Sequence, residues 1–257
     1  MKQIFVGIDF SLNSTGICIE IDDKDYYFNF FNDTKFGNHK KKNFHLGDFL
    51  LENKIYYDLF KNIDNLTVII RSQEPLPKPK DVGINRWGQW HFGVLEIYTD
   101  LIANTIYSFI QEMVSEPFKV VVSIENYSYN SFGDATIQII EMTSVLKHKL
   151  TKKSFLCSLD DLHIFPSPNI KKKFTGNGNA IKYDMFEAFL AFKRKSQDSF
   201  LDYLVANKLQ CYKEKYKIVK ETKKKPEHEI PNHEVLSPID DIIDAFFIKE
   251  YGKITIK

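Results

Sequence analysis

The sequence predicts an α/β protein, in which helices flank a layered sheet. Three strand-like segments come first, and helical segments then alternate with further strand-like ones. This order is typical of layered α/β domains. The chain has 257 residues, 43% of them hydrophobic, which is enough for one large domain with its own core.

The first three strands are expected to form an antiparallel meander. Residues 3–9 and 15–21 are apolar runs rich in β-branched side chains, and they are joined by a turn with Asn13, Ser14 and Gly16. Residues 26–31 alternate weakly as a third strand. Short connections between neighbouring strands favour antiparallel pairing.

Two segments are expected to be insertions. Residues 32–92 hold a basic stretch, three closely spaced prolines and one strand-like run at 67–70, which indicates loop character. Residues 193–235 are polar and rich in lysine. We expect both to lie within a single domain that spans residues 1–257.

The remaining segments alternate between helices and strands. Apolar residues recur at helical spacing in four segments, while two short apolar runs are typical of strands. The helices are expected at 92–114, 135–150, 181–192 and 237–251, and the strands at 118–125 and 162–165.

Two of the predicted strands end in an acid. Asp9 closes the run Ile4–Ile8, and Glu125 closes the run that begins near Phe118. A carboxylate at the end of a buried strand is unfavourable unless something pairs with it. Ligands of open α/β sheets bind at the carboxyl ends of the strands, so we expect Asp9 and Glu125 to converge there.

The last helix carries the other notable acids. Ser237 fits an N-cap and Pro238 the first helical position, which leaves Asp240 to favour the helix dipole and to cap backwards. Asp241 and Asp244 lie three residues apart on one helical face. Asp244 stands among apolar residues, which favours a functional role over simple solvation.

Four carboxylates without a matching cation predict a site for hard divalent metals. Two Mg²⁺ ions would neutralise the charges of Asp9, Glu125, Asp241 and Asp244. Pairs of such ions clamp the attacking and leaving oxygens in phosphoryl transfer. The alternative is that each acid lies apart and caps something local.

Four motifs of this chain, in order, resemble those of the RuvC family of Holliday-junction resolvases, within the ribonuclease H-like nucleases. Gly7-Ile8-Asp9 through Thr15-Gly16 resembles the first-strand motif, and Ile124-Glu125-Asn126 the second. The stretch 176–182 resembles a G-x-G-x-A-x-K segment, and residues 241–245 resemble the terminal D-x-x-D-A. The resemblance covers about half of the chain.

The resemblance implies a ribonuclease H-like fold with a five-stranded mixed sheet, often dimeric, that cuts branched DNA with Mg²⁺ or Mn²⁺. It assigns metal binding and catalysis to Asp9, Glu125, Asp241 and Asp244. Basic DNA-contacting positions fall on Lys171 and Lys182, and the charges of Lys172 and Lys173 would add to phosphate binding. The helix at 135–150 is the expected dimer surface.

The chain departs from the family pattern in places. Phe10-Ser11 replaces the usual Pro-Gly after the first acid, and the two insertions have no family counterpart. The family's aromatic residue after the glutamate has two candidates here, Tyr127 and Tyr129. The lysine- and asparagine-rich composition resembles bacteriophage members of the family.

Composition limits the remaining possibilities. The net charge is only +1, but basic residues gather at 147–182 and at 208–225. The three cysteines are widely separated, which disfavours a zinc site or a disulfide framework and fits a reducing cytoplasm. The sequence contains no apolar stretch long enough to span a membrane.

Two other functions stay open from the sequence. Actin-like and sugar-kinase-like ATPases also begin with a G-I-D-x-x-x-T-G-like hairpin, but we find neither their second glycine-rich hairpin nor their adenosine motif. A non-catalytic module that binds branched DNA or protein is the third possibility, although all four acids are retained.

Overall fold

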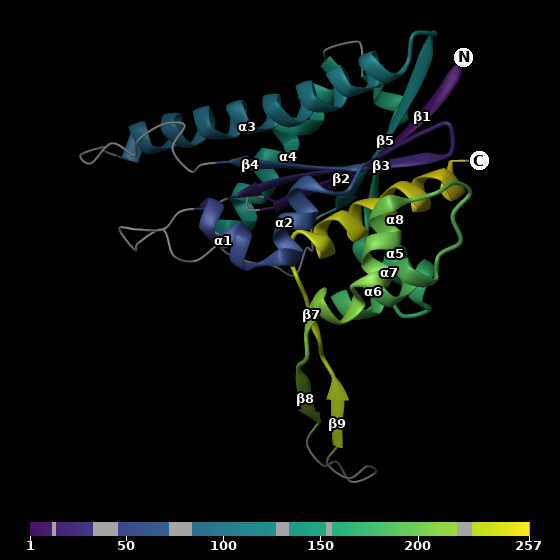
Figure 1. Ribbon diagram of the computed structural model, residues 1–257. Helices are drawn as coiled ribbons and strands as arrows, with labels where there is room; N and C mark the ends of the chain where they lie inside the picture. Colours follow the sequence, from purple (N-terminus) through teal and green to yellow (C-terminus); the bar gives the residue numbers. More distant parts are fainter. Residues whose placement is uncertain are drawn as a thin grey trace.

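Six strands form one mixed sheet in the described part of the chain, and helices lie against both of its faces (Figure 1). The computed structural model describes residues 1–11, 14–32, 46–71, 84–126, 134–152, 156–219 and 228–256. The strand order is β4-β3-β2-β1-β5-β6. The α/β class is therefore confirmed, whereas the expected number of five strands is wrong.

The N-terminal meander is confirmed. Strands β1 (Lys2–Asp9), β2 (Ser14–Ile21) and β3 (Lys24–Asn32) pair antiparallel in chain order. Asp22 and Asp23 join β2 to β3 with positive φ angles of 53° and 62°, as a two-residue hairpin turn requires.

The sixth strand comes from the segment that we expected to be a loop-like insertion. Helices α1 (Leu46–Glu52) and α2 (Lys54–Lys61) lead into β4 (Leu66–Arg71), which pairs parallel to β3. The amide of Asn65 donates to the backbone carbonyl of Asp25 at 3.0 Å and thereby fixes the start of β4. The short apolar run at 67–70 marked this strand but not its place at the sheet edge.

The other half of the sheet is parallel to β1. Strands β5 (Phe118–Asn126) and β6 (Leu162–Pro166) follow it in the order β1-β5-β6. Helices α3 (Ile84–Met113) and α4 (Asp134–Lys152) lie on one face and bury the alternate side chains of β1. Helix α3 begins at Ile84, well before the expected start at 92.

The opposite face is covered by helices from the C-terminal half. They are α5 (Ser167–Thr175), α6 (Lys182–Ala191), α7 (Ser199–Ala206) and α8 (Ile239–Thr255), with short 3₁₀ turns at Leu159–Asp161 and Lys208–Gln210. Helix α8 crosses β1, β2 and β5 (Figure 1). Phe189, Phe246 and Phe247 pack their rings against one another beneath it.

Glycines allow α8 to lie directly on the sheet. A Cβ atom at Gly7 would lie 2.1 Å from the carbonyl oxygen of Ala245, and one at Gly16 would lie 2.0 Å from the carbonyl oxygen of Asp241. These distances are far below any van der Waals contact, so each position requires the absence of a side chain. The two glycines of the first motif therefore set the position of α8.

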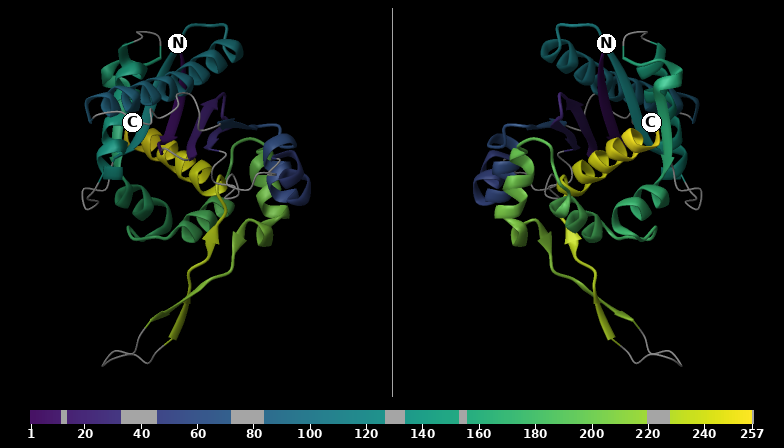
Figure 2. Two further views of the ribbon diagram at one scale, coloured as in Figure 1. Left: turned by 90° about the vertical axis from the view of Figure 1, so that its left-hand side faces the viewer. Right: turned by 90° about the vertical axis from the view of Figure 1, so that its right-hand side faces the viewer.

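A two-stranded arm projects from this helical layer (Figure 2). Its stem pairs β7 (Tyr212–Lys213) with β10 (Glu234–Val235), and its outer part pairs β8 (Tyr216–Val219) with β9 (His228–Pro231). We refer to residues 212–219 and 228–235 as the arm. The polar stretch 193–235 thus contains α7 and the arm.

Within the described residues, every helix is too short or too polar to cross a bilayer. Cys18, Cys157 and Cys211 are buried free thiols, as their wide separation in the sequence suggested.

Candidate active site at the carboxyl edge of the sheet

Asp9 and Glu125 lie side by side at one edge of the sheet. Asp9 is the last residue of β1, and Glu125 is the last but one of β5. The two strands run parallel, with Ile8 paired to Ile124, so the next residue along each strand carries a carboxylate. The strands therefore place both acids where α/β sheets bind ligands.

Asp241 and Asp244 reach the same edge from α8. Asp9 is paired with Gly16 in the β1–β2 ladder, and the missing side chain of Gly16 admits the backbone of Asp241. Both aspartates are buried, with exposed fractions of 8% and 7%. We call Asp9, Glu125, Asp241 and Asp244 the acid cluster.

The first turn of α8 differs slightly from the expectation. The helix begins at Ile239 with Pro238 at the N-cap, so Ser237 lies just outside it. The hydroxyl of Ser237 donates to Oδ2 of Asp241 at 2.9 Å and orients that carboxylate. Oδ2 of Asp240, which we expected to serve as a cap, lies 3.7 Å from Nζ of Lys182.

Lys182 brings a cation to the acid cluster. It is the first residue of α6, and its ammonium group contacts Oδ2 of Asp244 while 42% of its side chain stays exposed. The loop before it begins at Gly176, whose φ of 78° ends α5 in the left-handed conformation. The glycine-containing motif is thus the turn before a helix, and it delivers a lysine to the site.

The electrostatics indicate a surplus of negative charge. Burial raises the pKa of Asp9 well above its ordinary value; Lys182 opposes this, and the carboxylates of Asp244, Glu125 and Asp241 add to it. Burial and then Asp244 likewise raise the pKa of Glu125. These carboxylates are therefore close enough to repel one another.

The pKa of Lys182 is raised as well, but by its charged neighbours rather than by burial. Burial alone would lower it, but Asp244, Asp9 and other nearby carboxylates raise it well above the ordinary value. Lys182 is therefore a permanent cation at neutral pH.

The donor set fits a hard divalent cation, although the side chains are not preassembled around one. Carboxylate oxygens are the ligands that Mg²⁺ prefers, and one ammonium cannot neutralise four of them. Among the described residues, no three acid, imidazole or thiol groups form a ready-made metal cage. In the structure, the ammonium group of Lys182 forms an ion pair with the carboxylate of Asp244.

The remaining predicted site residues divide into two groups. Lys171 on α5 is half-buried, and its charge acts on Glu125, whereas Lys172 and Lys173 are exposed on the same helix. All three belong to the helix that starts beside Glu125. Tyr127 and Tyr129 lie outside the described residues.

Two serines bind carboxylates of the site, although the sequence analysis considered only Ser237, and only as an N-cap. The hydroxyl of Ser167 hydrogen-bonds to Glu125, as that of Ser237 does to Asp241. Each serine precedes a proline at the start of a helix, as Ser167-Pro168 and Ser237-Pro238. The repeated Ser-Pro pair was the signal that could have identified them.

The comparisons with known proteins add a distant structural likeness. None of the protein-family models and none of the curated proteins matches this chain. A solved structure of RuvC from Thermus thermophilus is similar over 78% of this chain and 89% of that one, with 11% identity and a TM-score of 0.32. So loose a superposition supports no inference about activity, and the case for a function rests on the residues themselves.

Proposed function

We propose that this protein is a divalent-metal-dependent endonuclease that cuts branched DNA, in the manner of a RuvC-like resolvase. One observation carries the proposal: half-buried carboxylates from β1 and β5 and buried ones from α8 converge at the carboxyl edge of the sheet with a surplus of negative charge. The order of the four sequence motifs supports the same reading.

The acid cluster would hold the metal. Asp9, Glu125, Asp241 and Asp244 would bind Mg²⁺, most simply two ions, with Mn²⁺ as a substitute. Bound metal supplies an activated water and stabilises the leaving 3′-oxygen. Ser167 and Ser237 would keep Glu125 and Asp241 in their orientations.

The lysines would bind the phosphodiester. Lys182 faces the acid cluster and keeps its charge, so it can neutralise a phosphate oxygen next to the bond that is cut. A metal ion at Asp244 would release Lys182 for this task, because the two cations compete for one carboxylate. Lys171, Lys172 and Lys173 would extend this contact along the backbone of the DNA.

Resolution of a junction requires two cuts, so we also propose a homodimer. The outer face of α4 is the proposed contact surface, since its inner face packs against α3 and Ile140 remains 41% exposed on it. The proposed partners of this protein are thus a second copy of itself and branched DNA.

The test is a cleavage assay on a synthetic four-way junction with Mg²⁺. We expect Asp9→Asn and Glu125→Gln to lower the rate by about 10³-fold or more, because each removes a metal ligand. Asp22→Asn and Glu116→Gln are the matched controls, because both acids are exposed and lie at the opposite edge of the sheet, in the turn after β2 and just before β5. Both variants should cleave the junction normally. Full activity of Asp9→Asn would overturn the proposal.

One observation favours the non-catalytic alternative. The ion pair between Lys182 and Asp244 closes part of the acid cluster without a metal. Binding of branched DNA with no cleavage under Mg²⁺ or Mn²⁺ would support that alternative. The structure does not favour the ATPase alternative. The space beside Gly7 and Gly16, where a phosphate would bind, is filled by the backbone of α8.

A further inference from the structure

The arm is rooted beside the acid cluster, and the proposed function does not yet use it. Tyr183 directly follows Lys182, and its ring lies 4.9 Å from that of Tyr212 and 4.6 Å from that of His233 at the stem of the arm. On the return side, β10 ends two residues before Ser237, which binds Asp241. Both strands of the arm therefore lead to residues of the site.

The outer part of the arm is uncovered by the body of the protein. It extends away from the helical layer in both views of Figure 2. Tyr216 and Ile218 are each 57% exposed. A ribbon of two strands gains little stability by itself in water, so large exposed side chains on such a ribbon indicate a partner.

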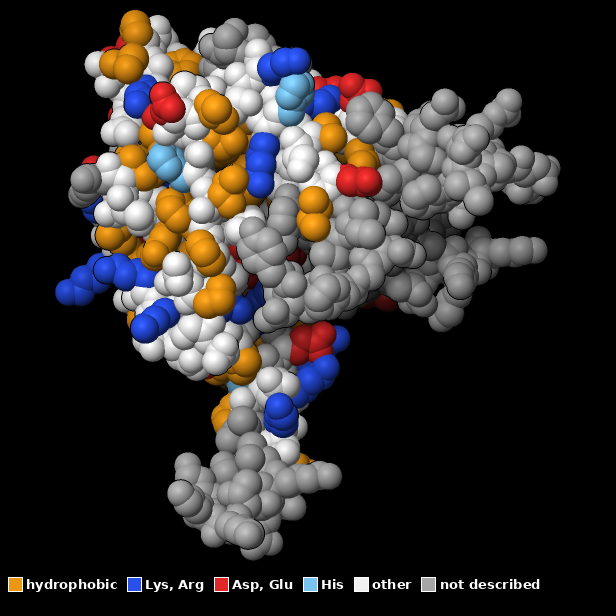
Figure 3. Space-filling model, turned by 180° about the vertical axis from the view of Figure 1, so that it is seen from behind, with side chains coloured by type: hydrophobic (Ala, Val, Ile, Leu, Met, Phe, Trp, Pro, Cys, Tyr) orange, Lys and Arg blue, Asp and Glu red, His pale blue; other side chains and the backbone are white. Residues whose placement is uncertain are grey.

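The charge of the outgoing strand indicates what that partner is. Lys213, Lys215 and Lys217 stand at alternate positions, which places them on one face of an extended chain. Figure 3 shows lysine side chains along the described part of the arm. The arm holds three lysines and three glutamates, but Glu214 and Glu229 fall on the opposite face, where Glu229 pairs with Ile218. Of the glutamates only Glu234, which neutralises Lys215, shares the lysine face, so that face keeps a net charge of +2. This is a surface suited to a polyanion.

The shape of the arm fits the same partner. The major groove of duplex DNA admits a two-stranded β-ribbon, and lysines at its edge can reach the phosphates on either side. We propose that the arm binds a duplex branch of the DNA substrate beside the bond that is cut. This inference rests on the proposed function, and it assigns to Lys213, Lys215 and Lys217 of the arm the task of holding the branch.

The test measures binding of a fluorescent four-way junction in metal-free buffer over a range of salt concentrations. We expect the triple variant Lys213→Gln, Lys215→Gln and Lys217→Gln to bind about tenfold more weakly or worse. The negative slope of log K against log salt concentration should become shallower by about two to three, because each lost phosphate contact removes about 0.9 from its magnitude. A second variant, Tyr216→Ser with Ile218→Ser, should weaken binding with an unchanged slope.

The matched control is Lys24→Gln, Lys152→Gln and Lys193→Gln, which removes three exposed lysines outside the arm. It should bind as the wild type does. Equal affinity of the arm variant and the wild type would overturn the proposal, as would equal weakening by the control. A change in sedimentation with unchanged DNA affinity would show that the arm contacts a second copy instead.

The two proposals can fail separately. If the wild-type protein binds the junction through the arm lysines but never cuts it, the proposed function fails and the role of the arm stands. If the wild-type protein cuts the junction and the arm variant binds and cuts equally well, only the role of the arm fails. Absence of any binding to DNA would overturn both.

Discussion

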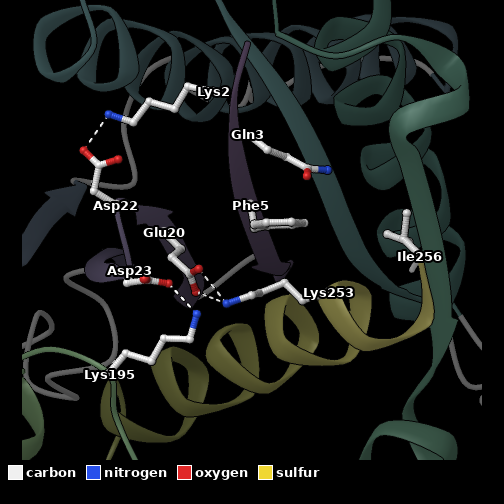
Figure 4. Close-up of a pocket in the computed structure, with 9 residues that line it drawn as sticks. All are labelled: Lys2, Gln3, Phe5, Glu20, Asp22, Asp23, Lys195, Lys253 and Ile256. Carbon is white, nitrogen blue, oxygen red and sulfur yellow. Dashed lines mark hydrogen bonds and ion pairs between the residues drawn. The ribbon is translucent and has the colours of Figure 1, made fainter.

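Helix α8 carries a charged cluster near each of its ends, and the two clusters differ in how their charges are balanced. At the N-terminal end, the acid cluster and Asp240 share the single ammonium of Lys182. At the C-terminal end, Lys249 binds Glu20 at 2.9 Å and Glu250 at 2.8 Å, and also contacts Asp25. Figure 4 shows Lys253 beside Glu20, at 2.5 Å, on the rim of a cavity of about 570 Å³.

The two clusters differ in how far lysines within the chain neutralise their carboxylates. Lys249 is fully buried, and its ammonium group pairs with three carboxylates. Burial by itself would raise the pKa of Glu20, but Lys249 and Lys253 lower it below the ordinary value. The pKa of Asp9 is instead raised well above it. Burial also raises the pKa of Asp25, but in that cluster two ammonium groups face three carboxylates, whereas the ammonium of Lys182 stands beside the four of the acid cluster. An added cation would therefore offset more charge at the acid cluster.

The largest effect on stability should come from removing Lys249, and it should far exceed that of removing Lys182. Lys249→Ala leaves three carboxylates without their buried partner, and we expect it to lower the free energy of unfolding by about 3–5 kcal/mol. Lys182→Ala should lower it by about 1 kcal/mol at most, because that side chain is 42% exposed. Urea denaturation measures both values.

A third variant serves as the control for Lys249. Lys249→Met combined with Glu20→Gln and Asp25→Asn removes the lysine together with two of its three carboxylates, while Glu250 keeps Lys253 nearby, and should recover much of the lost stability. Equal losses for Lys249→Ala and Lys182→Ala would contradict the distinction between the two clusters.

Alanine at the two glycines where the ends of α8 meet the sheet, Gly16 of β2 and Gly252 of α8, should have an intermediate effect. A Cβ at Gly16 meets the backbone of Asp241, which cannot move without shifting α8, and we expect a loss of about 1–3 kcal/mol together with loss of cleavage. A Cβ at Gly252 would lie 2.1 Å from Oγ of Ser123, which can rotate away. Thermal unfolding and junction cleavage of both variants compare the two ends, and a milder Gly16→Ala would contradict this account.

The smallest effect should be a difference in the pH dependence of stability, measured without metal. The folded state raises the pKa of Asp9, so ionising it destabilises the protein increasingly as pH rises above the ordinary value of 3.8. The stability of Asp9→Asn relative to the wild type should therefore rise with pH. Thermal unfolding from about pH 4 to about pH 8 measures it.

Glu20→Gln should respond to pH in the opposite way. The folded state lowers the pKa of Glu20, so its charge stabilises the protein above the ordinary value of 4.5, and this contribution is lost as pH falls through the folded pKa. Glu20→Gln should therefore destabilise the protein at neutral pH and less in acid. Parallel pH profiles for Asp9→Asn and Glu20→Gln would contradict the contrast between the clusters.

Local patterns were sufficient for much of the fold. The apolar runs around Val6 and Val121 identified strands, and the acids that end them identified the carboxyl edge of the sheet. The sixth strand could not be placed, because the short run near Val68 does not reveal which edge it will pair with. The arm was missed because its strands are short and polar.

The sequence by itself determined the parts of the site: the acids Asp9, Glu125, Asp241 and Asp244, the basic motif ending in Lys182, and the strands and helices that carry them. Only the tertiary structure decided how these residues are placed relative to one another. Gly16 sets the approach of α8 to the sheet, and Lys182 forms an ion pair with Asp244, a residue distant in the chain. Such contacts depend on which backbones pack together, and periodicity along one chain does not contain that information.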